Sequence, residues 1–198
     1  MVERQGTQSV ALIRPATFLS DDRLTYDGTQ LRSHWILETF GLRGDAIVGF
    51  EGPADVRDGH LVDLDDRSRG LFIAGAAMRH FIVESFGPDL DRGVFLQRLL
   101  VLLVREILAE KGISDVRRSG DDLFVGDGKL TVSIATVSPV SCLVHLGVNV
   151  TSEGTPVRTA NLTDLGLDPR GFAESLIARF ADEIDGMACA TGKVQGVS

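Results

Sequence analysis

The side chains best suited to chemistry lie in residues 119–149, and Lys129 is the most distinctive of them. The chain has only three lysines, of which Lys111 falls at the end of an expected helix and Lys193 lies in the C-terminal tail. Lys129 follows Gly126-Asp127-Gly128, a sequence typical of a tight chain reversal, and it opens a run of alternating polar and apolar residues. A fixed ammonium at the start of a strand can stabilise negative charge on a carboxyl or acyl oxygen.

Polar residues recur at every second position on two expected neighbouring strands. Thr131 and Ser133 follow Lys129 on one side of the first strand, and His145 and Asn149 alternate with apolar residues on the second. If the two strands form a hairpin, we expect these side chains to share one face, as the floor of a ligand site would. The alternative is an ordinary solvent-facing side of an antiparallel sheet.

Several charged residues near this segment are further candidates for ligand binding. Arg117 and Arg118 end an expected strand shortly before Lys129, and these three cations are the candidate contacts for an anion. His34 precedes Trp35 in a short expected helix. It either lines a pocket or has no role beside a tryptophan that packs in the core.

Two groups of acidic and histidine residues allow metal or proton chemistry. His80 and Glu84 are four residues apart in an apolar run, residues 71–86, that we expect to be a largely buried helix. On one helical face they could hydrogen-bond, act as an acid/base pair or share a metal, although the second histidine of zinc-protease motifs is missing. Asp63, Asp65 and Asp66 suggest either a hard cation or a solvated loop. We assign none of these residues as a metal ligand.

The elements that must position these residues follow from hydrophobic periodicity and from stop signals. We expect an α+β fold, a mainly antiparallel sheet with helices packed on it. A loop at residues 151–167 is long enough to cover a site. The expected strands are 9–14, 45–51, 113–118, 121–125, 129–135 and 141–150, and the expected helices are 29–40, 71–86, 91–111 and 168–186.

The run DDLFVGDGKLTVSIAT resembles a segment of the biotin and lipoate protein ligases, in which an acidic pair begins a strand and a lysine opens the next after a glycine-rich turn. The resemblance implies a biotin/lipoate ligase and class II synthetase-like core. It also implies that Lys129 contacts acid and acyl-adenylate oxygens and that Asp121 and Asp122 lie near the ligand. VHLGVNV resembles the biotin-ligase strand of the Gly-x-Asn-Val type. Together with YDGTQLRSHW, HFIVE and QRLLV, these motifs look closest to an uncharacterised domain family.

The chain departs from the ligases in ways that leave its activity open. Val132 stands where the ligases have a glycine three residues after the lysine, and neither the Gly-Arg-Gly-Arg loop nor the Arg-Arg-x-Gly-Gly-Gly loop is present. One hypothesis is an acyl or cofactor (biotin/lipoate-like) transferase or ligase that uses Lys129, with ATP and magnesium implied as cofactors by the resemblance alone. The alternatives are a non-catalytic small-molecule-binding domain and a metal-dependent hydrolase built on the residues described above.

Composition limits the remaining classes of function. With 198 residues, of which 43% are hydrophobic, we expect one domain over residues 1–198, with a frayed tail at 187–198. The net charge of −8 argues against nucleic-acid and anionic-membrane partners, and no apolar run reaches the ~20 residues that span a bilayer. Cys142 and Cys189 give no disulfide framework, so we expect a cytoplasmic protein. The polar residues around Lys129 lead us to expect a small-molecule ligand. Whether it forms a homodimer is left open.

Overall fold

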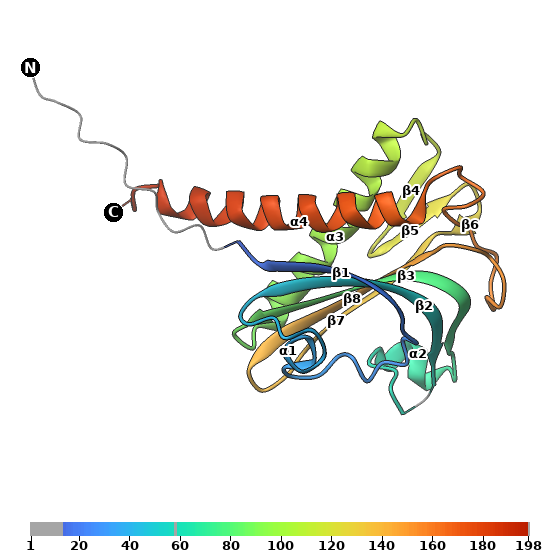
Figure 1. Ribbon diagram of the computed structural model, residues 1–198, viewed down its shortest axis with the longest axis horizontal. Coiled ribbons are helices and arrows are strands. Elements are labelled where there is room, and N and C mark those ends of the chain that lie inside the picture. The colour runs from blue at the N-terminus through green and yellow to red at the C-terminus, as the bar shows by residue number, and fades with distance from the viewer. Residues whose placement is uncertain (1–13, 58, 198) are drawn as a thin grey trace, which may run out of the picture.

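The fold is α+β and is built on a five-stranded sheet in the order β1-β2-β3-β8-β7 (Figure 1). The computed structural model describes residues 14–57 and 59–197. In the large sheet β1 pairs parallel with β2, and every other neighbouring pair is antiparallel. A small second sheet, β4-β5-β6, lies beside it. The strands are β1 (Ala16–Arg23), β2 (Ala46–Val56), β3 (Ile73–Phe86), β4 (Val116–Ser119), β5 (Asp122–Val125), β6 (Gly128–Lys129), β7 (Thr131–Val137) and β8 (Ser141–Asn149).

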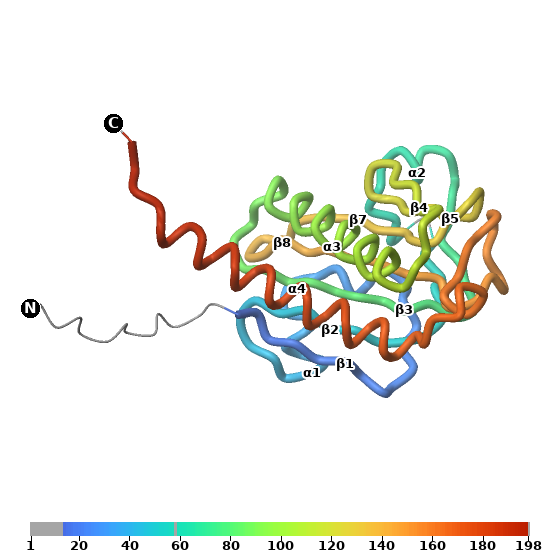
Figure 2. Tube along the Cα trace, turned by 90° about the horizontal axis from the view of Figure 1, so that it is seen from above, coloured from blue at the N-terminus to red at the C-terminus, as the bar shows by residue number. Residues whose placement is uncertain are grey.

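Two long helices cover one face of the large sheet, and two short helices lie on the other (Figures 1 and 2). Helix α3 (Leu90–Glu110) packs on β7 and β8, and α4 (Pro169–Gly192) packs on β1, β2 and α3. Helices α1 (Trp35–Phe40) and α2 (Leu64–Ser68) belong to the opposite side. We call these two sides the helix face and the cavity face.

A hydrophobic cluster lies on each face of the sheet. The larger joins α3 and α4 to inward-facing residues of the strands, such as Phe81 and Leu146, both 0% exposed. The smaller packs Trp35 and Ile36 of α1 against Val48 and Phe50 of β2. The large sheet therefore has buried residues on both sides, which explains why its central strands read as nearly continuous apolar runs.

The helix expected over residues 71–86 is wrong, because this segment is the central strand β3. β3 pairs with β2 on one side and with β8 on the other, and it is buried on both faces. A strand buried on both faces lacks the alternation that distinguishes strands from helices in sequence. The expected end at Gly87-Pro88 was right, since both kinds of element stop there.

Other boundaries differ at the chain ends and at the helix caps. Most of the strand expected at residues 9–14 lies outside the described residues, and the first described strand begins after Pro15. Asp89, not Asp91, caps α3, because its carboxylate accepts a hydrogen bond from the Arg92 backbone N–H. Helix α4 does not end at Gly186 but continues to Gly192.

The C-terminal part of α4 extends away from the rest of the protein (Figures 1 and 2). All fully buried residues of α4 lie between Phe172 and Ala181, Ile184 still packs against the core, and most of the residues after it are exposed. The amphipathic pattern therefore covers only the half of the helix that packs on the sheet.

Candidate functional site

The candidate site is a cavity of about 480 Å³ on the cavity face, between the β5-β6 hairpin, the segment around α2 and the loop at 155–159. Its polar lining includes one ammonium and several carboxylates, whereas much of the remaining wall is apolar. The charged members are Asp63, Asp66, Asp121, Asp122 and Lys129. Apolar members include Leu61, Val62, Leu71, Phe72, Ile73, Met78, Val132, Ile134 and Val157.

Lys129 is held in place by its backbone. The Lys129 N–H donates to the carbonyl of Arg158, and the N–H of Ala160 donates to the carbonyl of Lys129, so that the 155–159 loop runs beside β6. A Cβ at Gly128 would lie 2.5 Å from the backbone nitrogen of Ala160, so this close approach requires glycine. The glycine turn and the loop thus fix the lysine at the cavity wall.

The Lys129 ammonium pairs with the carboxylate of Asp122, with 2.7 Å between Nζ and Oδ2. The two side chains are 28% and 26% exposed, so the pair is largely removed from bulk water. Burial raises the pKa of Asp122 above its usual value; the hydrogen bond from Lys129 opposes this shift, and the charges of Asp121 and Asp66 add to it. The charge of Lys129 is therefore offset by Asp122, whose ionised form is disfavoured by the nearby charges of Asp121 and Asp66.

Asp121 and Ser133 belong to a second polar group at the same end of the cavity. Gln97 of α3 donates from Nε2 to Asp121 Oδ2 and to Ser133 Oγ, at 2.8 Å in each case. Ser133 Oγ in turn donates to Asp121 at 3.2 Å. Arg98 lies 3.7 Å from the other carboxylate oxygen of Asp121. The Asp121 carboxylate is therefore satisfied by Gln97, Ser133 and Arg98 and not by Lys129.

The expectation that the polar residues of β7 and β8 share one face is wrong. Thr131 lies opposite Val148 and Ser133 opposite Leu146, and directly paired residues point to the same side of a sheet. Thr131 therefore points to the helix face, where its hydroxyl accepts a hydrogen bond from the Leu123 N–H. Ser133 also has this register, although it reaches the cavity lining from the edge strand. The strand expected over residues 129–135 is also divided at Leu130, because Lys129 belongs to β6 of the small sheet and Thr131 begins β7. The alternation expected to place Lys129 and Thr131 on one face was therefore wrong, as was the pairing between the two strands.

Asn149 lies in the cavity wall and braces the segment that carries Lys129. Its side-chain nitrogen donates to the carbonyl of Lys129 at 3.0 Å and to the carbonyl of Ala160 at 3.3 Å. The residue is 3% exposed. Its amide thus connects β8, β6 and the loop.

His145 and His80 form a buried pair behind the cavity wall. His80 Nδ1 and His145 Nε2 are 3.1 Å apart, and His80 Nε2 lies 3.2 Å from the carbonyl of Gly52. If His80 Nε2–H donates to that carbonyl, His145 must donate to His80 Nδ1. Burial lowers the pKa of His80 to about 3, and burial followed by the nearby His80 lowers that of His145 well below its usual value. Both rings are neutral at neutral pH.

Tyr26 separates this histidine pair from the cavity. Its ring stacks on His145 with 3.5 Å between centroids and an angle of 10°, and Tyr26 itself lines the cavity. Tyr26 was not among the residues expected at the site, although it is the sole tyrosine in the chain. Burial, and then the charge of Asp27, raises the pKa of the phenol, so its hydroxyl stays protonated.

Glu84 and His34 lie away from the cavity lining and contact each other. Glu84 Oε1 accepts hydrogen bonds from the His34 backbone N–H and from Ser141 Oγ, at 2.8 Å each. His34 has a positive φ of 62° just before α1, and Glu84 holds it there. On a strand, His80 and Glu84 are separated by roughly 13 Å along the chain, so they do not form the expected pair.

The remaining candidates also have other partners. The guanidinium of Arg117 lies 4.3 Å from the centre of the Phe124 ring, and Arg118 donates to the carbonyl of Gly120. Neither arginine lines the cavity. Asp63 caps α2 by accepting from the backbone N–H groups of Asp65 and Asp66.

The structure does not bring together the acids and histidine proposed for a metal-dependent hydrolase. Asp63 and Asp66 belong to the α2 segment, whereas His80 and Glu84 contact different partners on the large sheet. Within residues 14–57 and 59–197, no group of three or more His, Cys, Asp or Glu side chains is arranged to hold a metal ion.

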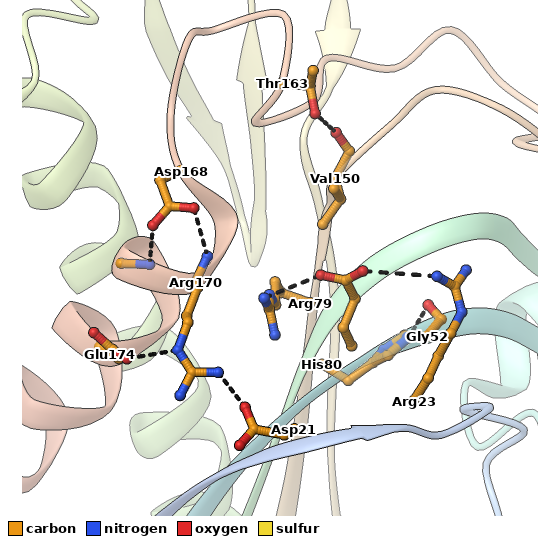
Figure 3. A network of polar contacts seen from close by, with 12 residues as sticks. Asp21, Arg23, Gly52, Arg79, His80, Val150, Thr163, Asp168, Arg170 and Glu174 are labelled. Carbon is orange, nitrogen blue, oxygen red and sulfur yellow. Dashed lines mark hydrogen bonds and ion pairs between the residues drawn. The ribbon is translucent and has the colours of Figure 1, made fainter.

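A second polar network lies on the helix face, and it ties the first three strands together (Figure 3). Arg79 of β3, 8% exposed, pairs with Glu51 of β2 at 3.1 Å, and Glu51 also faces Arg23 of β1 at 3.8 Å. Close by, Arg170 in the first turn of α4 pairs with Asp21 of β1. The ion pair with Glu51 satisfies one end of the buried Arg79 guanidinium, whereas its Nε has no partner within the described residues.

The fold is similar to that of biotin and lipoate protein ligase catalytic domains. A Thermoplasma acidophilum protein assigned as a lipoate protein ligase and carrying bound lipoic acid superposes with a TM-score of 0.52 at 19% identity, covering 87% of this chain and 86% of that one. A biotin protein ligase from Aquifex aeolicus, in complex with biotin and ATP, gives a TM-score of 0.55 at 15% identity over 87% and 71% of the two chains. At these identities the likeness concerns the fold alone.

The chain belongs to the family described as "Domain of unknown function (DUF366)", whose model matches residues 16–195. A protein of unknown function from Pyrococcus horikoshi is 38% identical, with a TM-score of 0.88 over 92% of this chain and 98% of that one. An uncharacterized protein of Methanocaldococcus jannaschii is 36% identical over 171 residues, which cover 83% of this chain and 77% of its own. No helix within the described residues is long and apolar enough to cross a membrane.

Proposed function

We propose that this protein binds a small carboxylic acid in the cavity and acts as an acyl or cofactor transferase or ligase. The observation that carries the proposal is the position of Lys129, the sole lysine or arginine among the described residues that line the cavity, where it lies beside carboxylates and a largely apolar wall. An acyl chain could lie along Ile73, Met78, Val132 and Ile134 while its carboxyl oxygen meets Lys129. The lipoate-bound and biotin-bound neighbours of the same fold support a ligand of this kind.

The residues of the chain would bind and orient the acyl group. Lys129 would offset negative charge that develops on the acyl oxygen, an effect that is strongest in a site with little water. In the transfer itself, the acceptor nucleophile forms a bond to the acyl carbon, the bond to the leaving group breaks, and the acceptor's proton passes to solvent. The acyl donor would be an activated acid, such as an acyl-adenylate. Asp122 would hold the ammonium, and Asn149 would hold the backbone beneath it.

The cavity offers little to a free triphosphate. Lys129 is the sole lysine or arginine among its described lining residues, and four carboxylates share the same cavity. Two proteins of similar fold are bound to ATP, but that is a property of those proteins and not of this chain. The residues present do not fit an unaccompanied nucleotide, so the activation step is assigned to no residue here.

The proposal is tested with Lys129→Met/Asp122→Asn, because replacing the lysine alone would leave Asp122 buried without its partner. Octanoate, lipoate and biotin are titrated by calorimetry, and pyrophosphate release is followed with ATP and magnesium present. We expect at least one acid to bind, and its binding and any turnover to be lost in the double variant. Lys111→Met, on the exposed end of α3, is the control that should retain both.

The result that would overturn the proposal is an absence of binding by these three acids and by L-2-aminooctanoate, or full activity in the double variant. A melting temperature close to that of the unchanged protein shows that the variant is folded.

A non-catalytic small-molecule-binding domain is the second candidate. It is favoured by the missing nucleotide loops and by the single cationic side chain among the described cavity residues. Saturable binding of an acid, with no pyrophosphate release and no transfer from an acyl-adenylate, would identify this function.

A further inference from the structure

The cavity carries more negative charge than Lys129 can neutralise. Four carboxylates line it, and one of them, Asp122, already pairs with the lysine. Asp121 is shared by Gln97, Ser133 and Arg98. A simple carboxylate that approached Lys129 would enter a region where the net charge is negative, which opposes its binding.

Asp66 is the carboxylate without a partner. It lies in the first turn of α2, where the cap formed by Asp63 fixes its backbone, and its side chain lines the cavity. Its carboxylate forms no hydrogen bond or ion pair with another residue of the described chain. It is close enough to Asp122 for its charge to raise the pKa of that carboxyl, although burial, Lys129 and Asp121 each influence this pKa more.

Tyr26 adds a neutral polar group to the cavity wall. The residue is 2% exposed and lines the cavity, and its hydroxyl forms no hydrogen bond with residues 14–57 or 59–197. The hydroxyl oxygen is not among the buried side-chain atoms that lack a partner, so water or a bound molecule in the cavity can reach it. The protonated phenol is therefore a donor available to a bound molecule.

We propose that the acid bound here is an amino acid with an aliphatic side chain. Its carboxylate would meet Lys129, its ammonium would meet Asp66 and Asp122, and its side chain would lie along Met78 and the neighbouring apolar wall. The ammonium supplies the positive charge that the cavity lacks, and each charged group then has a partner of opposite sign. This inference rests on the proposed function, because it specifies the acid that Lys129 binds.

The test compares two probes that differ only in the amine, L-2-aminooctanoate and octanoate. In calorimetric titrations of the full chain, we expect the amino acid to bind about tenfold more tightly, the ratio that one charge-assisted hydrogen bond contributes. Asp66→Asn should weaken binding of the amino acid by a similar factor while leaving octanoate unchanged or binding more tightly. Asp65→Asn, which removes a neighbouring carboxylate of α2 that does not line the cavity, should change neither affinity.

The opposite signs expected for the two probes separate a role in binding from a role in structure. If Asp66→Asn weakened both probes equally, Asp66 would be maintaining the cavity and the inference would be overturned. If octanoate bound as tightly as the amino acid and lost its binding in Lys129→Met/Asp122→Asn, the inference would fail while the proposed function stood. If neither probe bound, and lipoate and biotin did not bind either, the proposed function itself would fail.

Discussion

Replacing Asn149 by alanine is expected to destabilise the protein through the wall that carries Lys129. The substitution removes the hydrogen bonds from Asn149 Nδ2, on a residue that is 3% exposed, to the carbonyls of Lys129 and Ala160. The Lys129 carbonyl keeps its bond from the Ala160 N–H, but the carbonyl of the half-buried Ala160 loses this donor. Two bonds at about 1 kcal/mol each, with part of a desolvation penalty, give a loss of about 2–3 kcal/mol.

The aspartate variant sharpens this prediction. Asn149→Asp keeps the shape of the side chain but turns the donor into an oxygen that faces two carbonyl oxygens. An uncompensated buried charge costs about 3–5 kcal/mol, so the aspartate variant should be less stable than the alanine variant, although it is the closer match in volume.

The free energy of unfolding is measured in urea by circular dichroism, and amide hydrogen exchange is followed at Lys129 and Ala160. For a chain of this size, 2–3 kcal/mol corresponds to a fall of roughly 5–10 °C in melting temperature. Exchange at both amides should accelerate more than exchange in β2. A loss below about 0.5 kcal/mol for Asn149→Ala, or an aspartate variant at least as stable as the alanine variant, would refute the bracing role of the amide.

Two further predictions concern backbone packing and pH. Gly128→Ala should lower the free energy of unfolding in urea by about 1–3 kcal/mol, because its Cβ would lie 2.5 Å from a backbone nitrogen. Gly186→Ala, in the open part of α4, should be neutral or stabilising. Equal effects of the two substitutions would contradict the close approach at Gly128. His80 and His145 are neutral in the fold, with pKa values below the ordinary 6.5, so the unfolded chain takes up protons first as the pH falls. The free energy of unfolding should therefore decrease by about 4 kcal/mol for the two residues between pH 7 and pH 5. His80→Phe/His145→Phe should lose this dependence and His60→Gln should keep it; a pH profile unchanged in the double variant would argue against a neutral buried pair.

Much of the fold was predictable because small and polar residues alternate with apolar ones in several of its strands. Residues 45–51, 121–125 and 141–150 alternate, and the structure has strands there. The exception, β3, is buried on both sides, so its sequence carries no alternation, and only its pairing with β2 and β8 makes it a strand. That information lies in distant parts of the chain.

The candidate site was predictable in part, and the limit again was set by long-range contacts. The glycine turn before Lys129 is a local signal, and it placed the lysine at a cavity wall. The register that sends Thr131 to the helix face depends on how β7 aligns with β8, which neither strand encodes alone. Two other residues reach the cavity from distant segments of the chain: Asp66 lies more than 60 residues before Lys129, and Tyr26 lies more than 100 residues before it.

The projecting end of α4 gives the protein a built-in reporter of two kinds of opening. Cys189 is exposed on this part of the helix, whereas Cys142 is buried in β8. A thiol reagent should therefore label Cys189 at once, and it should reach Cys142 only when the central sheet opens. Because opening of core strands approaches the free energy of global unfolding, the slow labelling phase measures the stability of the whole fold under native conditions. The fast phase leaves a probe on the exposed C-terminal part of α4.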